Sequence, residues 1–142
     1  MKTDKQKYIS EQRRDKEWKW FNEKVTELMK SNDFYGLGSI YYEMADFVKK
    51  EGKDNTYLLQ LGFKMKLKFQ NNRLMDYKRS DICTGVEIIA VTNSPGNNSC
   101  ETCLQLDGKI FPIDEALLNN PLPVKNCSHE YGCRCVYGPA FD

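Results

Sequence analysis

Five of the six cysteines and the only histidine of this 142-residue chain lie between residues 100 and 135. They are ordered Cys100-x2-Cys103, then a gap of 23 residues, then Cys127-x-His129-x3-Cys133-x-Cys135. Short-range ligand pairs separated by one loop are typical of tetrahedral zinc sites. Such a site can hold together a segment that has few apolar side chains of its own. The spacing therefore predicts that zinc is bound by some of these six residues.

Six candidate ligands exceed the four that one zinc ion requires, and three arrangements follow. In the first, zinc is bound by Cys100, Cys103, His129 and one of Cys133 or Cys135, because alternating residues of extended chain are expected to point to opposite faces. In the second, all four ligands are cysteines. In the third, two zinc ions share thiolates. Cys83 lies apart from the cluster and is predicted to be a small buried apolar residue.

The chain carries no sequence signal for secretion or for a membrane. Residues 1–10 are polar, and no segment approaches the roughly 18 uninterrupted apolar residues of a membrane span. We therefore expect an intracellular, cytoplasmic protein without a membrane partner. In a reducing compartment, cysteines persist as metal ligands or free thiols, which favours zinc over three disulfides.

Charge divides the chain near residue 82. Residues 1–82 hold 18 Lys and Arg against 13 Asp and Glu, whereas residues 83–142 hold 3 against 7. All five prolines also lie in the second part. The sequence therefore predicts a helical region over 1–82 and a zinc-binding module over 83–142.

The first part is predicted to be helical. Apolar residues from Trp18 to Met29 recur at helical spacing within the segment 8–30, and a second stripe runs from Leu37 to Val48. Lys49 and Lys50 followed by Gly52 predict the end of the second helix. Residues 63–69 alternate in the period of a strand, but the apolar spacing from residue 58 to residue 69 favours a helix.

The second part mixes short strands with a short helix. β-Branched residues predict a strand over 86–92, followed by a turn. A brief strand is expected at residues 110–111 and a helix of one to two turns over 112–118. The fold class predicted is α+β, with a helical hairpin or bundle followed by a small zinc-stabilised module that contains strands.

Residues 98–139 resemble the cysteine-bearing end of phage Mu F-like minor head proteins. The matching positions are Cys100, Cys103, Leu106, Gly108, Lys109, Cys133, Arg134 and Cys135. The resemblance implies a zinc-ribbon-like fold of phage or mobile-element origin, acting in a bacterial host cell. It also implies a role in head morphogenesis.

The function predicted is that of a non-enzymatic module with structural zinc and a protein partner. One rival is a metal-dependent hydrolase or nuclease, whose best candidate groups would be His129 and Glu130; it requires an open coordination position and a base. Another rival is a nucleic-acid-binding adaptor. Its phosphate contacts would come from the basic residues Lys64, Lys66, Lys68, Lys78 and Arg79.

Overall fold

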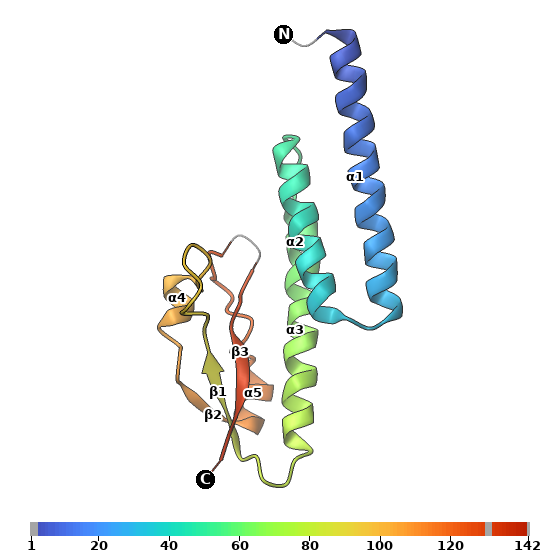
Figure 1. Cartoon of the computed structure of the whole chain (residues 1–142). Helices are drawn as coiled ribbons and strands as arrows, with labels where there is room; N and C mark the ends of the chain where they lie inside the picture. Colours follow the sequence, from blue (N-terminus) through green and yellow to red (C-terminus); the bar gives the residue numbers. More distant parts are fainter. Residues whose placement is uncertain (1–2, 130–131, 142) are drawn as a thin grey trace.

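Three long helices are followed by a small three-stranded sheet that carries two short helices (Figure 1). The structure is a computed structural model that describes residues 3–129 and 132–141. This arrangement confirms the predicted α+β class. The order along the chain is α1 (Asp4–Lys30), α2 (Phe34–Lys50), α3 (Thr56–Lys78), β1 (Gly85–Ile89), α4 (Glu101–Leu104), β2 (Ile110–Pro112), α5 (Ile113–Asn119) and β3 (Val136–Ala140).

Helices α1 and α2 begin where side chains satisfy their first backbone N–H groups. A capping box formed by Thr3 and Gln6 starts α1 at Asp4, four residues before the start of the predicted segment 8–30. Asp33 accepts a hydrogen bond from the backbone N–H of Gly36 at the start of α2. Gly52, with φ of +77°, follows the end of α2, as the sequence predicted.

Residues 63–69 are helical and belong to α3, which confirms the preferred reading of that segment. Their alternating apolar residues are explained by packing on two sides. Leu58, Leu61 and Met65 contact the cluster between α1 and α2, whereas Leu74, further along α3, joins the cluster under the sheet. A helix buried on more than one side carries apolar residues outside a single stripe.

The sheet is antiparallel, with strand order β2-β1-β3. Val86 and Ile88 of β1 are fully buried and face a core that also contains Tyr137 of β3 and Ile113 of α5. The predicted strands at 86–92 and 110–111 and the predicted helix at 112–118 are therefore present with shifted ends. The core of this part and the core of the helical part are separate clusters, and the boundary predicted near residue 82 stays a prediction.

Strand β3 and helix α4 were not predicted from the sequence. Gly138 and Pro139 are unusual within a strand, but β3 is an edge strand. Thr84 donates its backbone N–H to the Ala140 carbonyl at 3.1 Å, so Ala140 faces β1 and the neighbouring Pro139 faces away. A proline on the outer side of an edge strand costs no hydrogen bond of the ladder.

Helices α2 and α3 cross at Gly38 and Gly62. A Cβ atom on Gly62 would lie 2.9 Å from the Tyr42 ring, and one on Gly38 would lie 2.6 Å from Cγ of Lys66. The close approach therefore requires two residues without side chains. It also places Tyr42 and Lys66 at the edge of the cysteine-bearing half.

We predict that Gly62→Ala lowers the free energy of unfolding by about 1–3 kcal/mol, because the added methyl group collides with Tyr42 and with the backbone of α2. In an unconstrained helix the same change would raise stability by about 0.5–1 kcal/mol. Asn72→Ala, at an exposed position of α3, is the control and is expected to change stability by less than about 0.5 kcal/mol. Urea unfolding followed by circular dichroism measures both, and a stabilised Gly62→Ala variant would contradict the close crossing.

Candidate metal centre

Five cysteine sulfur atoms from three separate segments converge at one end of the sheet. Cys100 is the N-cap residue of α4 and Cys103 lies within that helix, Cys127 lies in the loop after α5, and Cys133 and Cys135 precede β3. Two groups of three sulfur atoms lie within 4.8 Å of one another: Cys100, Cys103 and Cys127, and Cys103, Cys133 and Cys135. Cys103 belongs to both groups. It is fully buried, and it is the sulfur around which the others gather.

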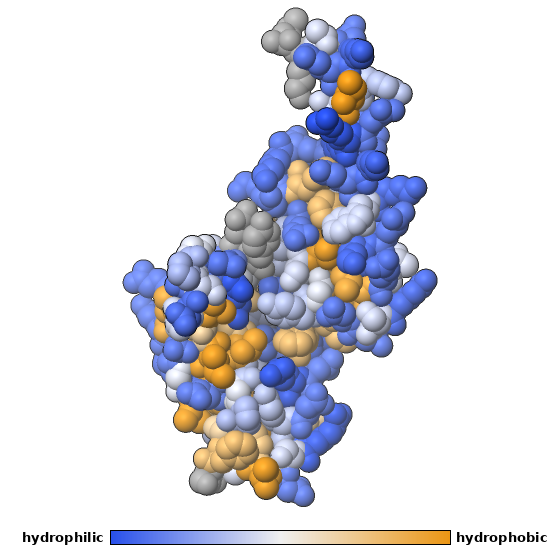
Figure 2. Space-filling model, in the orientation of Figure 1, coloured by the Kyte–Doolittle hydropathy of each residue, from blue (hydrophilic) through white to orange (hydrophobic). Residues whose placement is uncertain are grey.

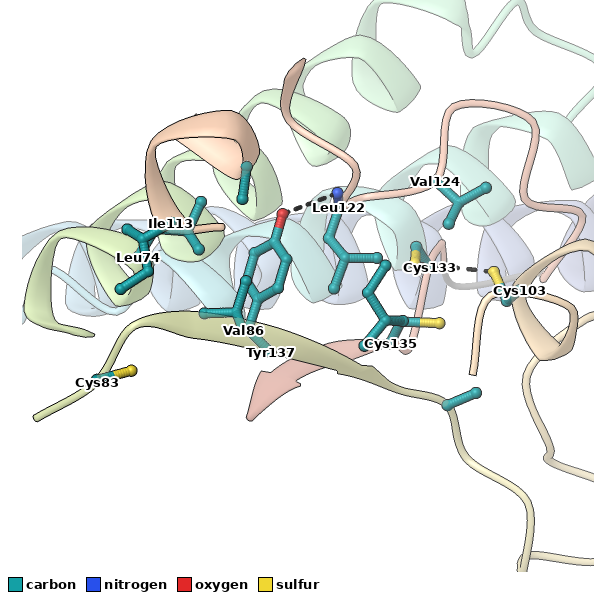
Figure 3. Close-up of a cluster of buried hydrophobic side chains, with 13 residues drawn as sticks. Leu74, Cys83, Val86, Cys103, Ile113, Leu122, Val124, Cys133, Cys135 and Tyr137 are labelled. Carbon is teal, nitrogen blue, oxygen red and sulfur yellow. Dashed lines mark hydrogen bonds between the residues drawn. The ribbon is translucent and has the colours of Figure 1, made fainter. Parts of the chain in front are cut away.

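The shortest sulfur contacts link the two parts of the predicted motif. Sγ of Cys100 lies 3.6 Å from Sγ of Cys127, and Sγ of Cys103 lies 3.9 Å from Sγ of Cys133. Figure 3 shows Cys103, Cys133 and Cys135 together at one end of the buried cluster and Cys83 at the other end. Cys83 donates its thiol to the Gly85 carbonyl, and its near-complete burial confirms the prediction made for it.

Cys133 and Cys135 both lie close to Cys103, whereas sequence analysis expected them to point to opposite faces. The reason is the period of extended chain. Neighbouring side chains alternate between faces, and residues two apart, such as Cys133 and Cys135, therefore lie on the same face. Cys103 lies within 4.8 Å of both.

His129 is placed beside the centre but belongs to neither group of sulfur atoms. Its ring Nε2 lies 3.2 Å from Oδ1 of Asn97, and its backbone N–H donates to Sγ of Cys127 at 3.4 Å. The backbone of His129 thus supports Cys127. Glu130, the other group considered for a hydrolase, lies outside the described residues.

Hydrogen bonds lower the pKa of two of the sulfur atoms. Although burial opposes it, hydrogen bonds from the backbone N–H groups of Cys103 and Ser128 lower the pKa of Cys100 to about 6. A hydrogen bond from the Cys135 thiol, with backbone N–H groups acting against burial, lowers the pKa of Cys133 to about 6. Donating that hydrogen bond raises the pKa of Cys135 itself.

For the other two sulfur atoms, those of Cys103 and Cys127, the pKa is raised and burial is the largest cause. Burial raises the pKa of Cys103, and the nearby Cys133 adds to this increase. It also raises the pKa of Cys127, against a hydrogen bond from the His129 backbone. Crowded thiols in a buried site resist ionisation unless a cation compensates their charge. The cluster therefore has the chemistry of a metal site and fits a soft divalent cation.

Helix α3 fixes the chain that carries Cys133 and Cys135. Gln70 donates to the Cys135 carbonyl at 3.0 Å, and Lys66 donates to the Cys133 carbonyl at 3.4 Å. Arg73 and Tyr77 both donate to the Tyr137 carbonyl, at 3.3 and 3.2 Å. The donors are spaced four, three and four residues apart, so they lie on one face of α3. The acceptors are two residues apart, as the outward carbonyls of an edge strand must be.

Lys66 is a buried cation at this interface. It is 3% exposed, and its Nζ lies 5.1 Å from the Tyr35 ring centre and 5.3 Å from that of Tyr42. Burial lowers its pKa, whereas the nearby sulfur atoms of Cys133 and Cys127 favour its charged form. Sequence analysis treated it as a solvated residue. Its burial could have been suspected only from its helical spacing to Gln70 and Arg73.

The other basic residues proposed to contact phosphate differ in their surroundings. Because residues 63–69 are helical, Lys64 and Lys68 lie on one exposed face of α3, whereas Lys66 lies on another. Lys78 pairs with Asp114 at 2.9 Å, and Arg79 pairs with Asp76 at 2.8 Å. Lys66 is withdrawn into the interface described above.

Gly132 lets the loop before Cys133 approach α2. Its φ is +83°, and a Cβ atom there would lie 2.6 Å from the Tyr42 ring. Both the left-handed backbone and the close contact require glycine. Sequence analysis did not single out this residue, although a glycine directly before a ligand is a signal for a tight turn.

Among the described residues, no helix has both the length and the apolarity that crossing a membrane requires. No protein-family model matches the sequence, and no curated protein or solved structure is significantly similar to it. The resemblance of residues 98–139 to phage head proteins therefore stays a prediction.

We predict that Arg73 and Tyr77 are energetically coupled through the Tyr137 carbonyl. Each single change, Arg73→Met or Tyr77→Phe, leaves one donor in place, whereas the double variant leaves a partly buried acceptor without a protein donor. The double variant should lose about 1 kcal/mol more than the sum of the single variants.

The control is the cycle of Arg79→Met with Tyr77→Phe, because Arg79 pairs with exposed Asp76 instead. That cycle should be additive within about 0.5 kcal/mol. Equal coupling in both cycles, measured by chemical unfolding, would contradict the role given to the Tyr137 carbonyl.

Proposed function

We propose that the protein binds one zinc ion through Cys100, Cys103, Cys127 and Cys133, and that it acts as a non-enzymatic interaction module. The observation that carries the proposal is the convergence of cysteine sulfur atoms, which among the described residues include no carboxylate and no imidazole in their two groups. All-thiolate donor sets are typical of structural zinc sites. Zinc bound there would link the three segments of the chain that supply the sulfur atoms.

Cys133 is preferred over Cys135 as the fourth ligand. Sγ of Cys133 lies 3.9 Å from Sγ of Cys103, and it accepts a hydrogen bond from the Cys135 thiol. Donors of this kind commonly surround metal ligands and orient them. Cys135 therefore supports Cys133 in this proposal. The four cysteine ligands fill all coordination positions of a tetrahedral zinc ion.

Nearby cations suit a zinc ion with four thiolates, which carries a net charge of −2. Lys66 approaches from α3, and Arg134 donates a hydrogen bond to the Asn97 carbonyl beside the centre. Buried charge needs compensation of opposite sign. The positive charge of Lys66 would thus offset part of the negative charge of the zinc–thiolate centre, and the centre would in turn compensate the charge of the buried lysine.

The donor set argues against the hydrolase. A catalytic zinc keeps an open position for water, and it is usually held by three protein ligands. Four thiolates leave no such position, and they also donate so much charge that the ion is a weak Lewis acid. Two carboxylates near the cysteines have structural partners: Asp107 accepts from the Ala90 N–H at 2.9 Å, and Asp114 pairs with Lys78.

A protein partner is supported by exposed apolar side chains on the cysteine-bearing half. Four large apolar residues are more than half exposed there: Ile82, Ile110, Leu118 and Phe141. Figure 2 shows hydrophobic surface gathered on this half of the molecule. Exposed apolar surface of this kind is typical of interaction sites. The phage or mobile-element origin and the role in head morphogenesis follow from the sequence resemblance.

The proposal predicts the zinc content of a set of cysteine variants. Wild-type protein should contain about one zinc ion per chain, as expected for one tetrahedral site. Alanine at Cys100, Cys103, Cys127 or Cys133 should abolish zinc retention. Cys135→Ala and Cys83→Ala are the matched controls, and both should keep the wild-type content.

Elemental analysis after gel filtration measures these values. Zinc near two per chain would instead indicate the shared-thiolate cluster, and bound iron with visible absorption would indicate an iron–sulfur site. Wild-type protein without metal, or a Cys103→Ala variant that keeps zinc, would contradict the proposal.

A further inference from the structure

Helix α1 carries a basic stripe on the face that points away from the rest of the protein. We define the basic stripe as Lys5, Ile9, Arg13, Lys16, Lys19 and Trp20, all of which are exposed. Lys5, Ile9, Arg13, Lys16 and Trp20 are spaced four, four, three and four residues apart, which places them in one line along a helix. Over these 15 steps the line is about 22 Å long.

The opposite face of α1 is the one that contacts α2. Trp18 stacks on Phe47 of α2 with ring centres 5.9 Å apart, and Arg14 pairs with Glu51 at 3.5 Å. Residues 14 and 18 lie roughly across the helix from the line through Ile9, Arg13 and Lys16. The basic stripe is therefore directed to solvent, and the first turns of α1 extend beyond the ends of α2 and α3 (Figure 1).

Two acidic residues near the basic stripe line clefts between α1 and α2. Asp15 lines a cleft of about 340 Å³ with Trp18 and Val48, and Glu17, four residues after Arg13, lines another with Phe21 and Phe47. Within the part of the chain that the structure describes, the four cations of the basic stripe form no ion pair. The protein has a net charge of only +1, so this local concentration of cations is not a consequence of its overall charge.

We infer that the basic stripe binds the phosphate backbone of a nucleic acid. Four cations along about 22 Å of exposed helix match a regularly charged polyanion. Trp20, half exposed at one end of the line, offers a ring on which an unpaired base can stack. This inference rests on residues other than those of the metal centre and is independent of the proposed function.

The composition of the stripe disfavours two other kinds of partner, a membrane surface and a partner helix. A helix that lies on a membrane needs a continuous apolar face, whereas the stripe has only Ile9 and Trp20, 11 positions apart. A partner helix would need an apolar seam at heptad spacing, and the apolar residues of α1 that could supply one, such as Phe21 and Val25, already pack in the helical core.

The test is fluorescence anisotropy of the full chain with two labelled probes, a random-sequence DNA duplex and a single strand of the same length. Wild-type protein should bind with a Kd in the micromolar range at low salt. If all four cations contact phosphate, log K should fall with log salt at a slope of about −3.6 for the duplex and about −2.8 for the single strand. Tighter binding of the single strand would assign a stacking role to Trp20.

Two variants with equal net charge separate the stripe from a general charge effect. Lys5→Gln, Arg13→Gln, Lys16→Gln and Lys19→Gln are combined in the stripe variant. The control combines Lys49→Gln, Lys64→Gln, Lys109→Gln and Lys125→Gln, which lie at exposed positions elsewhere. The stripe variant should bind at least tenfold more weakly with a salt slope near zero, whereas the control should keep most of the wild-type affinity and slope.

Circular dichroism checks that both variants retain their helices. The inference is overturned if wild-type protein binds neither probe at low salt, or if both variants lose affinity equally. It is also overturned if the stripe is required for binding vesicles of anionic lipid or for self-association, while nucleic acid binding is unaffected by its loss.

Discussion

The contact between α3 and the outer edge of β3 holds the two halves of this protein together. An edge strand exposes carbonyl groups that need donors, and α3 supplies Lys66, Gln70, Arg73 and Tyr77 at helical spacing. The same bonds fix the positions of Cys133 and Cys135, whose sulfur atoms face Cys103. The position of the cysteine cluster thus depends on a long helix that carries none of its sulfur atoms.

The close crossing of α2 and α3 makes that contact reach the cysteine centre. Gly38 and Gly62 bring the helices together and direct Lys66 and Tyr42 toward the loop before Cys133, where Gly132 leaves room for the Tyr42 ring. A lysine buried between two tyrosine rings is costly unless negative charge lies close to it. The cysteine sulfur atoms provide that charge in their thiolate form, so the helical packing and the chemistry of the centre depend on each other.

Local patterns predicted much of this structure from the sequence. Apolar periodicity located the three long helices, and Cys-x2-Cys with the later cysteines located the centre. Strand β3 was missed because Gly138 and Pro139 disfavour a strand locally, while the helix that covers its edge lies some 65 residues away. The role of Lys66 was missed for the same reason, since nothing in the local sequence distinguishes a lysine that is buried by tertiary contacts from an exposed one.

His129 stands among cysteines in the sequence and was counted as a candidate ligand. Its ring lies by Asn97 while its backbone supports Cys127, and ligation by its ring stays a prediction. Cys133 and Cys135 were expected to point to opposite faces, whereas the period of extended chain places both on one face. The spacing of the cysteines therefore identified the segment that forms the centre, and three-dimensional contacts show which of the candidate side chains lie close to one another.

X-ray absorption at the zinc edge of the purified full-length protein tests the central claim most directly. A closed thiolate centre predicts a first shell of four sulfur atoms at about 2.3 Å, with no nitrogen or oxygen. A shell that requires an imidazole nitrogen would contradict the four-cysteine ligand set, and three protein ligands with an oxygen at about 2.0 Å would contradict the closed centre and favour a catalytic ion.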